Sequence, residues 1–340
     1  MDEPLLILIP IFNDWQASAL LLPQLDHTLD RYGLRAEVLL VDDASPTAPP
    51  VSFFRQQFSA LDRVDVLALR RNLGHQRAIA IGLAYAERHR PCRALAIMDG
   101  DGEDNPEDLP RLLARLETEN NPHIIFAERT RRGEGLLFRA FYHLYRVLHL
   151  VLTGIPVRVG NFSVMSAPVL GRLVAVSELW NHYAAAVFRS RIPYATVPTR
   201  RAKRLDGRSH MNFLALVIHG LSAILVHGEV VGVRLLLGTL VMLTIALISL
   251  LTFVGVGILT HSSISEWVLI AGGLGGLLLL QGVTLSILLV FFTLSSRSNA
   301  AFLPVRDYQY FIAEIQQLFP QTLDAAPPRP NTRGGESSIR

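Results

Sequence analysis

An acidic cluster follows a short apolar run in the first third of the chain. The segment MDGDGEDNPED places Asp99, Asp101, Glu103 and Asp104 close together, directly after the apolar run ALAI. Carboxylates this close repel one another unless a cation lies between them. Mg²⁺ and Mn²⁺ prefer oxygen ligands and typically combine one or two protein carboxylates with substrate phosphates. The cluster favours a divalent metal site, with Asp101 as first candidate. The alternative is a solvated acidic loop that caps a helix beginning near Pro106.

A basic cluster lies near residue 200. The segment PTRRAKRLDGRSHMNF carries Arg200, Arg201, Lys203, Arg204 and Arg208 beside a glycine and a serine. Arginine binds phosphate through two parallel N–H donors, so this cluster predicts an anionic ligand. Nucleic acid is another anion that such a cluster can bind, but no recognition motif accompanies it and apolar segments follow. We therefore predict a phosphate-bearing ligand and no nucleic-acid partner.

The charge of the chain is unevenly distributed. The 340 residues carry a net charge of +3, but residues 1–128 sum to −8, residues 129–234 to +11 and residues 235–340 to zero. Such asymmetry indicates an anionic partner for the basic block, although 31 of the 32 basic residues are Arg, and biased codon usage is an alternative reason for their number. Cys92 is the single cysteine, which fits a reducing compartment.

Two long uncharged stretches predict a membrane hairpin. Only 18% of the residues are charged and the mean hydropathy is +0.32, while residues 235–265 and 267–296 contain no Asp, Glu, Lys or Arg. Each stretch exceeds the length needed to cross a hydrocarbon core of roughly 30 Å. Two buried helices of a soluble core are the alternative. Basic residues flank the hairpin at Arg234, Arg297 and Arg306, which predicts a cytoplasmic catalytic domain and cytoplasmic termini. The opening residues lack the basic region of a signal peptide.

The first half of the chain alternates between strand-like and helix-like patterns. The runs LLILIPI, EVLLVDD, VDVLALR, ALAIMDGD and HIIFAER predict buried strands, and residues 15–31, 74–90 and 106–120 have helical spacing. This alternation predicts an α/β domain with a mostly parallel sheet. Ligands of such sheets bind at the carboxyl ends of strands. Polar residues follow the predicted strands there, namely Asn13, Asp14, Asp42, Asp43, Arg71, Asn72, Asp99 and Asp101. Neither a GxGxxG nor a GxxxxGK[ST] loop is present.

Four ordered motifs resemble those of a known family. PIFND, VDDAS, RNLGHQRAIAIGLAYA and MDGDGEDNPEDLP are similar to the motifs of family 2 glycosyltransferases of GT-A fold, a Rossmann-like α/β architecture. With the apolar hairpin added, residues 4–315 resemble the membrane branch that contains dolichyl-phosphate mannose synthase and bacterial polyprenyl-phosphate glycosyltransferases. In that branch a helix such as 136–152, with Arg139, His143 and Arg146 on one side, lies in the membrane interface, and 211–227 fits a second such helix. A helix packed on the soluble domain is the alternative for 136–152.

The resemblance implies roles for individual residues. It assigns catalysis to Asp99, Asp101, Arg204 and Arg129, and a Mg²⁺ or Mn²⁺ ion to Asp101 and Glu103. It implies nucleotide binding by Pro10, Asn13, Asp14, Asp42, Asp43, Arg71, Asn72 and Asp99. It implies acceptor-phosphate binding by Arg129, Arg200, Arg201, Arg204, Arg208, Ser209 and His210.

The chain also departs from the family pattern. His210 stands where the family has lysine, Glu103 where glutamine is common, and Asp14 where glutamate is usual. In GNFSVMS, Asn161 and Ser163 replace the Asp and Arg of a Gly-Asp-Phe-Arg motif, which changes sugar or acceptor contacts. Glu178 matches a position that is often polar in the family; an ordinary surface residue is the alternative there, as it is for Arg129.

The predicted reaction is metal-dependent, inverting transfer of a sugar from a UDP- or GDP-sugar to a polyprenyl phosphate, undecaprenyl or dolichyl. A phosphate monoester has a second pKa of about 6, so the acceptor needs no strong general base. The alternatives are a processive polysaccharide synthase and a non-catalytic nucleotide-sugar-binding membrane protein. The resemblance implies a bacterial inner-membrane protein, with a homotetramer as one possible assembly. The predicted segments are a catalytic domain at 1–210, an interfacial helix at 211–233, a hairpin at 234–296, a cytoplasmic segment at 297–320 and a disordered tail at 321–340.

Overall fold

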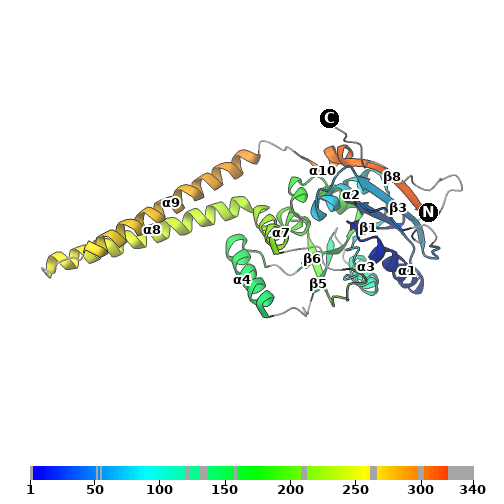
Figure 1. The fold of residues 1–340 in the computed structure, drawn as a ribbon, viewed down its shortest axis with the longest axis horizontal. Helices are drawn as coiled ribbons and strands as arrows, with labels where there is room; N and C mark the ends of the chain where they lie inside the picture. The colour runs from blue at the N-terminus through cyan, green and yellow to red at the C-terminus, as the bar shows by residue number, and fades with distance from the viewer. Residues whose placement is uncertain are drawn as a thin grey trace, which may run out of the picture. The chain divides into compact units, whose positions relative to one another are not determined.

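A computed structural model of the chain describes residues 3–50, 53, 56–118, 123–129, 136–156, 159–207, 213–260, 266–297 and 302–320. It divides into two compact units (Figure 1). The sheet unit comprises Met1–Arg132, Arg158–His210 and Phe302–Arg340, and the helical unit comprises Gly133–Val157 and Met211–Ala301. The helix that begins the helical unit therefore interrupts the sheet unit in sequence.

An eight-stranded mixed sheet forms the centre of the sheet unit. Its order is β7-β5-β6-β4-β1-β2-β3-β8, with parallel pairing around β1 and between β5 and β7 and antiparallel pairing at β6 and β8. This confirms the predicted α/β fold with a mostly parallel sheet. The five predicted strands are β1 (Leu5–Ile11), β2 (Ala36–Asp42), β3 (Leu61–Leu69), β4 (Ala94–Ile97) and β5 (Ile124–Arg129). Sequence patterns did not predict β6 (Val159–Ser166), β7 (Tyr194–Thr199) or β8 (Ile312–Phe319).

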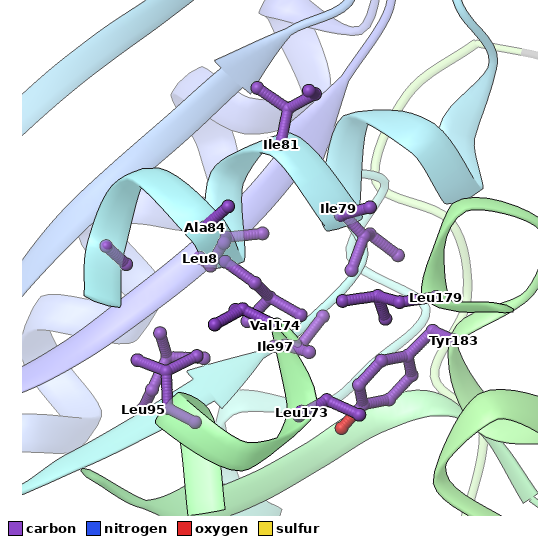
Figure 2. Close-up of a cluster of buried hydrophobic side chains, with 14 of the residues drawn as sticks. Leu8, Ile79, Ile81, Ala84, Leu95, Ile97, Leu173, Val174, Leu179 and Tyr183 are labelled. Carbon is purple, nitrogen blue, oxygen red and sulfur yellow. The ribbon is translucent and has the colours of Figure 1, made fainter. Parts of the chain in front are cut away.

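Helices cover both faces of this sheet, and β1 contributes alternate side chains to each face. Leu6 and Leu8 pack toward α2 in one buried cluster, whereas Leu5, Ile7 and Ile9 pack in the other cluster with residues of α1 and α3. Figure 2 shows side chains of the first cluster from α2, β1 and β4. The α-helices and the short 3-10 helices (η) of the sheet unit are α1 (Trp15–Arg31), α2 (His75–His89), η2 (Pro106–Asp108), α3 (Leu109–Thr118), α5 (Ala167–Leu173), η3 (Ser177–Trp180), α6 (Tyr183–Arg189), α10 (Pro304–Asp307) and η4 (Tyr308–Phe311).

A glycine allows α2 to lie close against the sheet. A Cβ atom at Gly82 would lie 2.7 Å from Leu8 Cδ1 and 2.7 Å from Val41 Cγ2, both of which belong to fully buried side chains. We expect Gly82→Ala to lower the free energy of unfolding by up to about 2 kcal/mol, because overpacking costs about 1–3 kcal/mol and the gain in helix propensity offsets about 1 kcal/mol of that cost. Denaturant unfolding of the full chain in detergent measures this.

The matched control is Gly171→Ala in α5, where a new Cβ would meet, among the described residues and within 4 Å, only Glu87 Oε1 at 4.0 Å. This variant should be as stable as the native chain or slightly more stable. Equal loss of stability in both variants would contradict the packing argument.

The helical unit contains α4 (Leu136–Thr153), α7 (Phe213–Leu225), α8 (Gly228–Leu259) and α9 (Glu266–Arg297). The segments Gly228–Leu259 and Gly272–Phe292 are long and apolar enough to cross a membrane, judged by length and composition. They coincide with the predicted hairpin, and their long apolar side chains are largely exposed, unlike those of buried core helices. Gly232 lies against Val290 and Gly282 against Thr239, so small residues let α8 and α9 pack together.

Helix α4 is hydrogen-bonded to α8 within the helical unit. Arg234 Nη1 donates to the carbonyl of Val151 at 2.8 Å, which satisfies one carbonyl in the last turn of α4. His149, one turn after Arg146 on this helix, is 4% exposed and hydrogen-bonded to the carbonyl of Ile155. Burial lowers the pKa of His149, so this residue adds no charge to the exposed face at neutral pH.

Candidate active site

The acidic loop after β4, residues 98–105, is ordered by its own carboxylates. Asp104 is 3% exposed and its Oδ2 accepts the backbone N–H of Asp99 at 2.9 Å, while Asp101 Oδ1 accepts the backbone N–H of Glu103 at 2.9 Å. The following helix is capped by Asn105, whose Oδ1 accepts from the N–H of Glu107 at 3.2 Å. The carboxylate of Asp104 therefore joins the end of the loop to its start, and Asn105 caps the helix.

The basic segment that follows β7, residues 200–207, lies on this acidic loop. The backbone N–H of Leu205 donates to the carbonyl of Asp101 at 3.0 Å, and that of Ala202 donates to the carbonyl of Glu103 at 2.9 Å. A Cβ at Gly102 would collide with the side chain of Leu205, and Gly102 has a φ of +80° that favours glycine. Two segments about a hundred residues apart in sequence therefore form one site.

Arg204 joins two of the predicted carboxylates. Its Nη1 lies 3.0 Å from Asp101 Oδ2 and its Nη2 lies 2.6 Å from Asp14 Oδ1. The guanidinium is mostly buried, at 16% exposed, and its Nε donates to the carbonyl of Asp206 at 2.9 Å. A second ion pair joins Arg201 to Glu103. The planar fork of arginine makes this double contact possible, and a lysine could not reproduce it.

The acidic residues of the loop suit a divalent cation. Burial and the neighbouring Asp99 raise the pKa of Asp101 to about 6, although Arg204 and Arg201 lower it. In the part of the chain that the structure describes, no group of three or more His, Cys, Asp or Glu side chains converges as a metal cage. Asp101 and Glu103 therefore fit an ion that takes only one or two protein carboxylates and completes its shell with ligand oxygens, as Mg²⁺ does. The guanidinium groups facing both side chains indicate that the site attracts positive charge.

We expect binding of Mn²⁺ to weaken in acid. Because the metal binds the ionised carboxylate, protons compete with it below the pKa of Asp101, which is about 6. Between pH 6 and pH 5 the dissociation constant should rise by up to about tenfold for this one proton, while from pH 7 to pH 8 it should stay nearly constant. Titration calorimetry with Mn²⁺ at four pH values measures this. A dissociation constant that stays constant down to pH 5 would contradict the assignment of Asp101.

The carboxyl ends of β1 and β2 carry a second group of predicted residues. Asn13 Oδ1 accepts from Thr47 Oγ1 at 2.8 Å, and Asp42 accepts from the N–H of Ser45 at 3.1 Å. Asp43 is 2% exposed, and its two oxygens accept the backbone N–H groups of Leu73 and Gly74 at 2.6 and 2.8 Å. The Asp43 carboxylate therefore fixes the backbone of the two residues that precede α2. Pro10 is buried within β1, and Arg71 and Asn72 are exposed after β3.

Three of the predicted acceptor-binding residues and the side chain of a fourth are not described by the structure. Arg208, Ser209 and His210 lie outside the described residues, as does the side chain of Arg129. The backbone of Arg129 ends β5 and pairs in register with Thr199 of β7, immediately before the basic segment. Arg200 lines an open hollow of about 410 Å³ together with Asn105, Asp108, Arg111, Pro198 and Thr199.

Sequence reasoning missed two polar residues at the start of α2. His75 Nε2 lies 3.2 Å from Asp99 Oδ1, and Gln76 donates to Asn161 Oδ1 at 3.1 Å. Their position directly after the Asn-x-Gly motif was the available signal, because that motif opens α2 at the carboxyl edge of the sheet. Glu178 of η3 is paired with Arg189 of α6 at 2.8 Å.

Comparison with known proteins identifies the domain that carries these motifs. Residues 6–173 match the family model described as Glycosyl transferase family 2. The chain carries a family 2 glycosyltransferase domain. This match covers all four motifs quoted above and confirms the resemblance inferred from them.

Two curated relatives illustrate this family 2 domain. The chain is 30% identical over 133 residues to dodecaprenyl-phosphate galacturonate synthase of Rhizobium johnstonii, covering 39% of this chain and 38% of the relative. It is 22% identical over 217 residues to undecaprenyl-phosphate 4-deoxy-4-formamido-L-arabinose transferase of Salmonella paratyphi B, covering 62% and 63%. The match thus spans less than two thirds of the length of these relatives.

Among solved structures, the chain is similar to glucosyl-3-phosphoglycerate synthase from Mycobacterium tuberculosis, crystallised with Mn²⁺, UDP-glucose and phosphoglyceric acid. The TM-score is 0.47 at 14% identity, over 68% of this chain and 79% of that one.

Proposed function

We propose that this protein transfers a sugar from a nucleotide-sugar donor to a polyprenyl phosphate in a membrane. The observation that carries the proposal is the position of Arg204, which joins the acidic loop to Asp14 at the carboxyl edge of the sheet. Such a site handles two anions, a nucleoside diphosphate and a phosphate, at neighbouring positions. The family 2 domain and the names of the two relatives, both of which act on polyprenyl phosphates, support the same reaction class.

The donor is expected to bind on the acidic side. Asp101 and Glu103 would hold Mg²⁺ or Mn²⁺, and that ion would neutralise charge on the departing nucleoside diphosphate. Asn13, Asp14 and Asp42 lie at the ends of β1 and β2, where a nucleoside reaches them in an open α/β sheet.

The acceptor is expected to bind on the basic side. Its phosphate oxygen attacks the anomeric carbon, the bond from that carbon to the diphosphate breaks, and in-line attack inverts the configuration. The acceptor is already mostly dianionic at neutral pH, so the protein needs to position and neutralise it rather than remove a proton. Arg204 and its neighbours Arg200 and Arg201 supply the positive charge for this step. Arg208, Ser209, His210 and Arg129 remain predicted members of the same set.

The helical unit fits a membrane-bound acceptor. A polyprenyl chain is accessible only from lipid, and α8 and α9 have the length and composition of membrane spans. Exposed Leu144 and Val151 on α4 and Ile218 and Leu225 on α7 suit insertion of both helices into the interface. Because basic residues flank the hairpin, we expect the termini and the sheet unit to lie on the cytoplasmic side of the membrane, which the resemblance implies is a bacterial inner membrane.

The test is a donor screen with the purified full chain. Mn²⁺, undecaprenyl phosphate and a panel of UDP- and GDP-sugars should yield one lipid-linked monosaccharide, detected by mass spectrometry of the lipid extract. A polymeric product would instead favour a processive synthase. Binding of a nucleotide sugar with neither transfer nor hydrolysis would favour a non-catalytic membrane protein, and either outcome would overturn the proposal.

A further inference from the structure

A polar relay leads from buried Tyr183 to the acidic loop within the sheet unit. Its members are Ser163 and Asn161 on β6, Gln76 and His75 at the start of α2, and Tyr183 at the start of α6. Asn161 and Ser163 are the two positions at which the chain departs from the Gly-Asp-Phe-Arg pattern. Although the Asp and Arg of that pattern are absent, the side chains of Asn161 and Ser163 are both hydrogen-bonded in this structure.

The direction of each hydrogen bond in the relay follows from a backbone donor. The N–H of Tyr183 donates to Gln76 Oε1 at 2.7 Å, so Gln76 presents its Nε2 to Asn161 Oδ1 at 3.1 Å. Asn161 must then present its Nδ2 to His75 Nε2, at 2.9 Å. An amide nitrogen only donates, so His75 Nε2 is the acceptor in this arrangement and its proton is on Nδ1.

Ser163 and Tyr183 hydrogen-bond next to Asn161, whose side-chain amide has one favourable orientation. Ser163 Oγ donates to the backbone carbonyl of Asn161 at 2.9 Å and therefore accepts from the hydroxyl of Tyr183 at 2.7 Å. Burial raises the pKa of Tyr183, so this hydroxyl keeps its proton. Turning the amide would place the NH₂ groups of Gln76 and Asn161 against each other, and the buried Gln76 would lose its acceptor.

The same nitrogen of His75 has a second partner. Asp99 Oδ1 lies 3.2 Å from Nε2, and this contact is favourable only when Nε2 carries a proton. One nitrogen cannot accept from Asn161 and donate to Asp99 at the same time. The protonated ring therefore favours Asp99, and the neutral ring favours Asn161.

The charged groups around His75 favour the protonated ring. Desolvation lowers the pKa of His75. The hydrogen bond to Asp99 and the charges of Asp99, Asp101 and Asp104 together raise it by more than desolvation lowers it, so the pKa lies above its ordinary value. Asp43, directly after β2, also interacts with this ring: burial raises the pKa of Asp43 overall, and the positive charge of His75 opposes part of that rise. The contact with Asp99 is present below the pKa of His75 and is lost as the pH rises through that value.

We propose that His75 is a pH-dependent positioning residue of the donor site, whose Nε2 holds Asp99 when protonated and Asn161 when neutral. Asp99 opens the acidic loop, two residues before Asp101, so its position affects how that loop receives a nucleoside diphosphate. Asn161 sets the pH of the change, because its amide stabilises the neutral ring. The effect on donor binding rests on the proposed function, whereas the protonation of His75 does not.

The first test is ¹⁵N NMR of the full chain labelled at histidine, in detergent, with His75 assigned by its loss in His75→Gln. In the native chain the neutral ring should carry its proton on Nδ1. Asn161→Asp replaces the amide donor with a second carboxylate and should raise the pKa of His75 by at least about one unit. Asn161→Ala should raise the pKa of His75 by less, and the neutral ring should no longer prefer to carry its proton on Nδ1. The control Asn181→Asp adds the same charge at an exposed position near Tyr183 and should leave His75 unchanged.

The second test is the pH profile of kcat/KM for the donor found by the screen. The profile should fall on the alkaline side at the pKa of His75, move to higher pH in Asn161→Asp, and lose this limb in His75→Gln. A neutral ring protonated on Nε2, or a pKa that Asn161→Asp leaves unchanged, would overturn the proposal. Because NMR reads the ring directly, absence of transferase activity would contradict the proposed function and leave this inference to be decided by the titration.

Discussion

Replacing Asp101 with asparagine is expected to reduce sugar transfer by about 10³-fold. A preorganised group that stabilises charge in the transition state is typically worth about 10²–10³-fold, and Asp101 is proposed both to hold the metal and to orient Arg204. Asparagine keeps the shape of the side chain, but its single oxygen can accept from either the backbone N–H of Glu103 or Arg204 Nη1, and the Asp101 carboxylate accepts from both. The loss should therefore come from the missing charge and from one missing acceptor. Initial rates with saturating donor, acceptor and Mn²⁺ measure it.

Stability separates this effect from misfolding. Burial and Asp99 raise the pKa of Asp101 to about 6, so its ionised form lowers the stability of the folded chain at neutral pH. The neutral asparagine should then leave the unfolding temperature unchanged or raise it. The matched control is Asp62→Asn, which removes a carboxylate from the surface ion pair with Arg35 and should change the rate by less than about twofold. Full activity of Asp101→Asn with the metal present would contradict the metal assignment.

Replacing Arg204 with lysine is expected to reduce kcat/KM for the polyprenyl phosphate by about 10- to 100-fold. Lysine keeps the positive charge but cannot contact Asp14 and Asp101 at once, and a hydrogen bond to a charged group is worth about 1.5–3 kcal/mol. The proposed role toward the acceptor predicts that KM for the lipid phosphate rises more than KM for the nucleotide sugar. Steady-state kinetics in which each substrate is varied separately measures both values.

The control is Arg35→Lys, because Arg35 makes a similar fork contact with Asp62 on the surface, away from the site. It should leave both KM values unchanged. A double-mutant cycle that combines Arg204→Lys with Asp14→Asn should give a coupling energy different from zero, since the two side chains touch at 2.6 Å. An equal rise of both KM values in Arg204→Lys would contradict its assignment to the acceptor.

Local patterns predicted the fold well where the chain repeats a strand and a helix. The first five strands are continuous apolar runs because both faces of the sheet are covered, and the three predicted helices have clear amphipathic spacing. Strand β6 was missed because VGNFSVMS carries polar residues whose partners, such as Tyr183, lie on other elements. Strand β8 was missed because it pairs with β3, more than 240 residues earlier in the sequence.

The candidate site was only partly predictable for the same reason. The acidic and basic clusters are each visible as composition, but nothing local shows that Arg204 meets both Asp14 and Asp101, or that Leu205 and Ala202 dock on the acidic loop. His75 was overlooked because a lone histidine after a glycine has no pattern of its own. Its significance comes from Asp99, in the loop after β4, and Asn161, on β6.

The measurement that tests the central claim most directly is mass spectrometry of the lipid product with and without a chelator. The purified chain, a nucleotide sugar and undecaprenyl phosphate should give a species whose mass is that of the acceptor plus one sugar, and EDTA should abolish it until Mn²⁺ is added back. The free nucleoside diphosphate should appear in equal amount. A chain that releases free sugar from the donor, or leaves undecaprenyl phosphate unmodified with every UDP- and GDP-sugar, would contradict the account.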